Sequence, residues 1–147
     1  MGPSLVCWQT GARALLCECP ALVTSLPASS APTCPDLAQL LHTAVAQAFN
    51  AVVITNAALD GEGPCITYCN PAFCRMTGYT EQELLGRSPR LLQGPHTDPQ
   101  VLQRLRECLR SGTFFQGSTV NYRKDGSSYL VEWNISPVRD AQGQVQA

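Results

Sequence analysis

Apolar side chains recur every three to four positions in two long segments of the chain, a spacing typical of amphipathic helices. In residues 37–49 they form a single stripe, and Asp36 stands before it as an N-cap. In residues 99–111 the same spacing follows Asp98, with a proline at the first helical position and a glycine after the last. The pattern therefore predicts a leading helix and a second long helix late in the chain.

Two shorter helices are predicted between these, and capping residues mark both of them. Asn70 is a cap with Pro71 at the first helical position, and Gly78 ends that helix. The sequence TEQE, at 80–83, is a capping box, in which the first and last side chains satisfy each other's free backbone amides. The second short helix ends at Gly86.

Four segments rich in β-branched and aromatic residues predict strands. They are AVVITNA at 51–57, CITYC at 65–69, FFQGSTVNYR at 114–123 and SSYLVEWNISPV at 127–138. The turn sequences LDGEG and KDGS join them in pairs, so we expect two antiparallel hairpins separated by helices. This order predicts an α+β domain in which the short helices pack on one face of an antiparallel sheet.

Residues 1–35 show no sustained periodicity, and their last part, SLPASSAPTCP, has the composition of a linker. We therefore assign residues 1–35 to a flexible leader and residues 36–147 to the folded domain. A chain of 147 residues has the size of one domain, and its hydrophobic fraction of 44% suits a packed core.

The charge balance argues against several classes of function. Ten basic and eleven acidic side chains leave a net charge of −1, which gives no basic field for nucleic acid. No apolar run reaches the length that spans a bilayer, and no secretory signal is recognised, so we expect a cytoplasmic protein without a membrane contact. No motif of a catalytic site is present, and we expect no enzyme activity.

Eight cysteines are present, but no C-x-x-C pair occurs, and the two histidines do not stand at zinc-site spacing. We therefore expect no metal site. Reduced thiols in the cytoplasm are favoured over the disulfide framework of a secreted protein.

Two long segments, NPAFCRMTGYTEQELLGRSPRLLQG and NYRKDGSSYLVEWNISPVRDAQG, resemble PAS domains. Within that superfamily they are most similar to the LOV (light, oxygen, voltage) branch and to bacterial sensory-box domains, and the resemblance covers about residues 40–147. It implies a sensory signal-input module that regulates an effector absent from this chain. It also implies a ligand between sheet and helices, for which FMN or FAD is the candidate.

The LOV motif G-x-N-C-R-F-L-Q-G corresponds to GRSPRLLQG at 86–94. Arg90 and Gln93 match it, Ser88 replaces the asparagine, and Pro89 replaces the photoactive cysteine. Photochemistry through a cysteine–flavin bond is therefore excluded at this site, because proline has no thiol. A serine followed by a proline is also a good helix start, which explains Pro89 without any direct role.

The resemblance assigns further positions to the ligand. Arg106 falls where the family has a second phosphate-binding arginine, and Asn121 matches an asparagine that binds the flavin ring. The family's next ring-binding asparagine corresponds to Val131. The expected cofactor-binding residues are thus Ser88, Arg90, Gln93, Arg106 and Asn121.

The missing amide leaves two alternatives for the cavity. Each donor or acceptor on the edge of the flavin ring costs about 1–3 kcal/mol if it is buried without a hydrogen-bond partner. The affinity for flavin is therefore reduced, or the cavity serves another ligand. The other alternative is a cofactor-free protein-interaction or dimerisation module whose cavity is packed by Trp133 and Val131. Haem is disfavoured, because the helix that carries its histidine in some PAS domains has none here.

The family's last strand, which lies in the middle of the sheet, would begin where this chain stops. Three outcomes follow: the chain is a fragment, a partner strand fills the gap, or the leader supplies a strand. We favour a fragment. A homodimer is expected either through helix 37–49 or through the open seam, with marginal stability if the seam stays open.

Overall fold

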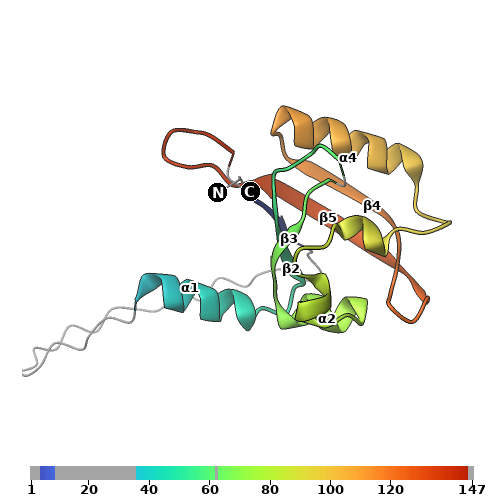
Figure 1. Cartoon of the computed structure of the whole chain (residues 1–147), viewed down its shortest axis with the longest axis horizontal. Helices are drawn as coiled ribbons and strands as arrows, with labels where there is room; N and C mark the ends of the chain where they lie inside the picture. Colours follow the sequence, from blue (N-terminus) through green and yellow to red (C-terminus); the bar gives the residue numbers. More distant parts are fainter. Residues whose placement is uncertain (1–3, 9–35, 62, 146–147) are drawn as a thin grey trace, which may run out of the picture.

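A five-stranded antiparallel sheet forms the centre of the fold (Figure 1). The computed structural model describes residues 4–8, 36–61 and 63–145. The strands are β1 (Ser4–Trp8), β2 (Val52–Asn56), β3 (Ile66–Cys69), β4 (Phe115–Tyr122) and β5 (Ser128–Pro137). Their order in the sheet is β3-β2-β1-β5-β4, and each neighbouring pair is antiparallel. The predicted α+β class is confirmed.

The helices all follow capping signals. They are α1 (Leu37–Ala46), α2 (Pro71–Thr77), α3 (Glu81–Leu84), the 3-10 helix η1 (Pro89–Leu92) and α4 (Pro99–Ser111). The side chains of Asp36, Asn70 and Asp98 each accept a hydrogen bond from a backbone N–H of the first turn. Gly78 and Gly112 end α2 and α4 in the left-handed conformation, as the sequence predicts.

The middle strand of the sheet comes from the beginning of the chain, and this corrects two expectations. Ser4–Trp8, assigned above to a flexible leader, pair with β2 from Ser4↔Asn56 to Trp8↔Val52. Along the other edge they pair with β5 from Leu5↔Pro137 to Trp8↔Asn134. The seam between the two hairpins is therefore closed by the leader rather than left open, because five residues rich in β-forming side chains suffice to pair both edges. The rest of the predicted leader lies outside the described residues.

The core lies between the sheet and the short helices. Phe73 of α2, Leu84 of α3 and Leu92 of η1 pack against the sheet residues Val53 and Ile66, and all five are buried. In Figure 1, α4 lies alongside β4 and β5, whereas α2 lies beside β2 and β3. Two helical groups thus cover different halves of the sheet.

Helix α1 contributes nothing to this core. It ends at Ala46, before the predicted end at 49, and none of its residues is buried. Leu37, Leu40 and Leu41 are each more than half exposed, and Phe49 beyond the helix is fully exposed. The predicted apolar stripe is therefore present but faces solvent.

Three further findings concern the described part of the chain. Four of the cysteines, at positions 65, 69, 74 and 108, are free thiols. No helix there is both long and apolar enough to cross a bilayer. No cluster of three or more metal-ligating side chains occurs in that part either.

Candidate functional site

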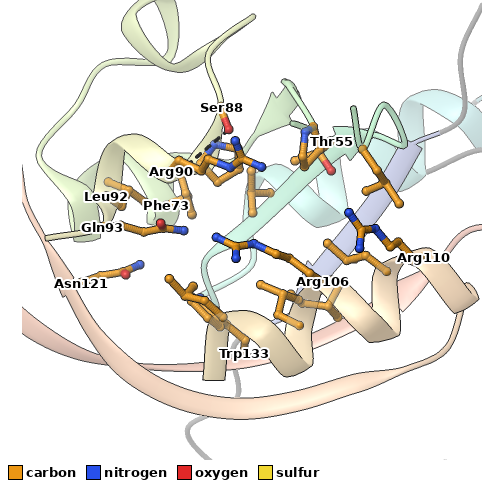
Figure 2. A pocket seen from close by; sticks show the side chains of 18 of the residues that line it. Thr55, Phe73, Ser88, Arg90, Leu92, Gln93, Arg106, Arg110, Asn121 and Trp133 are labelled. Atoms are coloured by element: carbon orange, nitrogen blue, oxygen red, sulfur yellow. Dashed lines mark hydrogen bonds between the residues drawn. The ribbon is translucent and has the colours of Figure 1, made fainter. Parts of the chain in front are cut away.

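A cavity of about 470 Å³ lies between the sheet and the helices. Figure 2 shows side chains converging on it from both layers. The five residues that the sequence assigns to a cofactor all line it: Ser88, Arg90, Gln93, Arg106 and Asn121. Sequence positions more than thirty residues apart are thus brought to one hollow, with η1 on one wall and α4 on another.

Three exposed arginines line the cavity. Arg90 extends from η1, and its Nη1 lies 3.5 Å from the carbonyl oxygen of Gly61. Ser88 caps η1 and accepts a long hydrogen bond, 3.5 Å, from the backbone N–H of Arg90. Arg106 and Arg110 extend from neighbouring turns of α4 (Figure 2). Three exposed arginines thus line one cavity from two elements, and guanidinium groups there can bind an anion.

The loop that follows β2 shapes the cavity next to Arg90. Gly63 has a φ of +86°, and a side chain there would lie 2.9 Å from Nη2 of Arg90. The glycine therefore provides both the left-handed turn and the space in which the Arg90 side chain lies.

Part of the cavity lining is buried and polar. Asn121 of β4 is only 3% exposed, and its Oδ1 has no hydrogen-bond partner among the described residues. The hydroxyl of Tyr129, on the paired strand β5, is also buried and unpartnered there. Because an unpaired buried acceptor costs about 1–3 kcal/mol, the Asn121 oxygen fits a ligand that donates a hydrogen bond, while the Tyr129 hydroxyl can donate or accept one.

The ionisation of Tyr129 is shifted by the same surroundings. Burial raises the pKa of the phenol, while the Asn121 side chain and the positive charge of Arg123 oppose the shift. Arg123 lies over the Tyr129 ring, with its guanidinium carbon 4.6 Å from the ring centroid. The phenol therefore stays protonated at neutral pH and keeps an O–H that can donate.

Apolar side chains form much of the remaining lining. They are Val53, Leu59, Phe73, Met76, Leu92, Leu102, Leu105, Leu109, Trp133 and Ile135. Trp133 lines the cavity but does not fill it. The alternative in which Trp133 packs the cavity closed therefore does not describe this structure. Val131 is buried at 2% exposure but does not line the cavity.

The cavity wall carries no thiol among the described residues. Pro89 lines the cavity at the position of the family's reactive cysteine. Cys69 and Cys74 lie in and against the core, with 3.8 Å between their sulfur atoms. Burial, followed by the nearby Cys74, raises the pKa of the Cys69 thiol to about 12, so this sulfur stays protonated. Core packing accounts for both thiols.

Sequence reasoning missed Arg110 and Thr55 as residues that line the cavity. Arg110 stands four positions after Arg106 on α4, and that spacing places both on one face of a helix. The signal was thus available. Thr55 lies on β2 and is buried, but a threonine in a strand gives no comparable signal.

A family model described as a PAS domain matches residues 50–147. The chain belongs to the PAS domain family. The match covers both hairpins, all the short helices and the long helix α4, and therefore includes every one of the cofactor positions named above.

Relatives of this PAS domain occur in larger regulatory proteins. It is 38% identical over 107 residues to the nitrogen fixation regulatory protein of Klebsiella pneumoniae, covering 73% of this chain and 21% of that protein. It is 34% identical over 116 residues to phototropin-1A of Oryza sativa subsp. japonica, covering 79% of this chain and 12% of that protein. The chain thus spans about a fifth or less of these relatives.

A solved light-oxygen-voltage domain, studied with a flavin analogue, superposes with a TM-score of 0.63 at 35% identity, covering 75% of this chain and 77% of that one. The PAS domain described here is therefore LOV-like in both sequence and structure. Domains of this kind are sensory signal-input modules, and that broad role applies here.

Proposed function

We propose that this PAS domain is a sensory input module that binds a flavin nucleotide in its cavity and regulates an effector outside the present chain. The observation that carries the proposal is the polarity of the cavity. Its lining contains exposed arginines, apolar side chains, and a buried amide oxygen that has no partner among the described residues. A ligand that suits all three parts is flat, apolar on its faces, polar at one edge and anionic at its tail.

The residues have distinct parts in this binding. Asn121 accepts a hydrogen bond from the ring edge through Oδ1, which at present has no partner in the described chain. Arg90 and Arg106 hold the phosphate, because guanidinium groups bind phosphate oxygens with two parallel hydrogen bonds. Gln93 and Ser88 provide further polar contacts.

The signal arises without a cysteine–flavin bond, because position 89 is proline. When bound, the flavin supplies redox or light chemistry, and this chain binds it, orients it and limits access of water. We propose no enzymatic reaction. The cytoplasm is the proposed compartment, which agrees with the free thiols of the described residues.

A spectrum of the purified protein tests the proposal. We expect a structured absorbance band near roughly 450 nm, as for any bound flavin. Asn121→Leu should weaken flavin binding about 5- to 50-fold, because it removes the buried acceptor. Gln116→Leu, an amide-to-leucine change at an exposed position of the same strand, is the matched control and should bind as the wild type does.

A colourless protein that flavin neither binds nor stabilises against heat would overturn the proposal. The remaining alternative would then be a cofactor-free dimerisation module. The exposed apolar side chains of α1 favour that alternative, since Leu37, Leu40 and Leu41 form an uncovered face. Size-exclusion chromatography with Leu40→Glu, Leu41→Glu as the comparison would show whether this face holds a second copy.

A further inference from the structure

The cavity lining contains one arginine more than a single phosphate group requires. Arg90 on η1 and Arg106 on α4 are the two that the family resemblance assigns. Arg110 lies one helical turn beyond Arg106 and also lines the cavity. In Figure 2, Arg106 extends in the direction of Gln93, whereas Arg110 points into the hollow on the side of Thr55.

These guanidinium groups lack carboxylate partners within the described residues. The ion pair found there joins Lys124 and Glu83, neither of which lines the cavity. Glu107, which lies between the two arginines on α4, instead accepts a hydrogen bond from Gln103 at 3.2 Å. Among the described residues, Asp60 is the carboxylate that lines the cavity, and no ion pair within 4.0 Å joins it to an arginine of that part of the chain.

Two like charges four positions apart repel each other along one face of a helix. A bound anion attracts both guanidinium groups and so offsets that repulsion. The monophosphate group of FMN carries about −1.5 to −2 charges on its oxygens, and two arginines balance that charge. A third arginine, one turn further along α4, fits a second phosphate joined to the first.

We propose that Arg110 is a specificity-determining residue that makes the cavity prefer a diphosphate-linked flavin dinucleotide over a flavin mononucleotide. This inference rests on the flavin-binding function proposed above. Arg90 and Arg106 bind the phosphate next to the ribityl chain, and Arg110 binds the second phosphate. The adenosine part then lies outside the cavity, next to the exposed arginines.

Titration of the apoprotein with FMN and with FAD, followed by flavin fluorescence, tests this assignment. We expect FAD to bind about 3- to 10-fold more tightly than FMN, a modest factor because the arginines are exposed. Arg110→Gln should abolish that preference while FMN binding stays within about twofold of the wild type. Arg106→Gln should weaken both ligands.

Arg104→Gln is the matched control. This arginine is on the same helix but lies over the ring of Phe115, 5.9 Å from its centroid, and does not line the cavity. It should leave both affinities unchanged. The FAD preference of the wild type should also shrink as salt concentration rises, since exposed charges are screened.

The two proposals fail in distinguishable ways. If neither FMN nor FAD binds to the folded apoprotein, flavin binding itself is overturned, and this inference with it. If both bind with equal affinity, or if Arg110→Gln leaves a preference for FAD intact, flavin binding stands and the role of Arg110 is overturned.

Discussion

Asn70 joins three segments of the molecule through one fully buried side chain. Its Oδ1 accepts hydrogen bonds from the backbone N–H groups of Val52 and Phe73, at 2.9 and 3.0 Å. Its Nδ2 donates to the carbonyl oxygens of Asn50 and Val45, at 2.9 and 3.1 Å. The start of β2, the start of α2 and the end of α1 are thereby fixed relative to one another.

Asn70→Ala should therefore be among the more damaging single substitutions. It leaves buried N–H and C=O groups without partners, and we expect it to lower the free energy of unfolding by about 2–4 kcal/mol. Urea denaturation measures this quantity. Asn56→Ala is the comparison, because Asn56 is only partly buried and its Oδ1 accepts one short bond, from Cys65 at 2.8 Å. Equal decreases in the free energy of unfolding of the two variants would show that the hydrogen bonds of Asn70 are no more important for stability than those of Asn56.

At the scale of elements, the short helix α3 is attached to the β4–β5 hairpin through Glu83. The carboxylate accepts hydrogen bonds from the backbone N–H and the hydroxyl of Thr80, both at 3.0 Å. It also pairs with Lys124, which lies in the turn between β4 and β5. The Lys124 contact and the Thr80 bonds lower the pKa of Glu83 from its ordinary 4.5 to about 2.

This lowered pKa predicts a pH-dependent contribution to stability. The ionised carboxylate is favoured in the folded state, so the contribution is fully present above pH 4.5 and is lost as pH falls through about 2. Glu83→Gln should therefore reduce Tm at neutral pH, and its difference from the wild type should narrow between pH 4.5 and 2. Thermal melts across that range measure it. A Tm difference that stays constant with pH would refute the coupling between the ionisation of Glu83 and the stability of the fold. Lys124→Gln should show a pH dependence similar to that of Glu83→Gln.

The elements themselves were largely predictable, because their ends carry local signals. Asn70 with Pro71, and Asp98 with Pro99, mark helix starts that need no knowledge of the rest of the chain. Whether the apolar side chains of α1 would be buried or exposed was not predictable from the sequence. A stripe indicates a face that can be buried, but only the tertiary arrangement decides whether another surface covers it.

For the whole molecule, sheet continuity depends on β1, since β2 and β5 each pair with it rather than with each other. Val6 is at the centre of the strand and is paired with Ile54 on one side and Ser136 on the other. Val6→Pro should lower the free energy of unfolding by about 3 kcal/mol or more, because proline has no N–H and disrupts a central strand.

Chemical denaturation and size-exclusion chromatography together measure this effect, and we expect the variant to associate through the exposed strand edges. Ala141→Pro is the control. It places the same residue in the turn closed by the hydrogen bond from Gly143 N–H to the Asp140 carbonyl, where proline is well tolerated. A Val6→Pro protein as stable and monomeric as this control would show that β1 is dispensable.

The candidate site was predictable where a motif carried it, and not elsewhere. Ser88, Arg90 and Gln93 belong to one contiguous motif, so their meeting at the cavity follows from local sequence. Arg110 was missed because a helix arginine near others is more often solvated than functional. β1 was missed because five residues pair here with strands far along the chain, and such non-local pairing leaves no trace in local periodicity.

The position of β1 also sets an order of events during biosynthesis. The residues of β1 leave the ribosome before those of both hairpins, yet Trp8 must wait for Asn134, on the order of 130 residues later, before the second edge of β1 can pair. The two hairpins can therefore be joined into one sheet only after β5 has been synthesised, when the earlier strand β1 pairs with both. Such a late, long-range closure is slow and leaves strand edges exposed in the meantime, so folding yield in the cell should depend on chaperones that shield them.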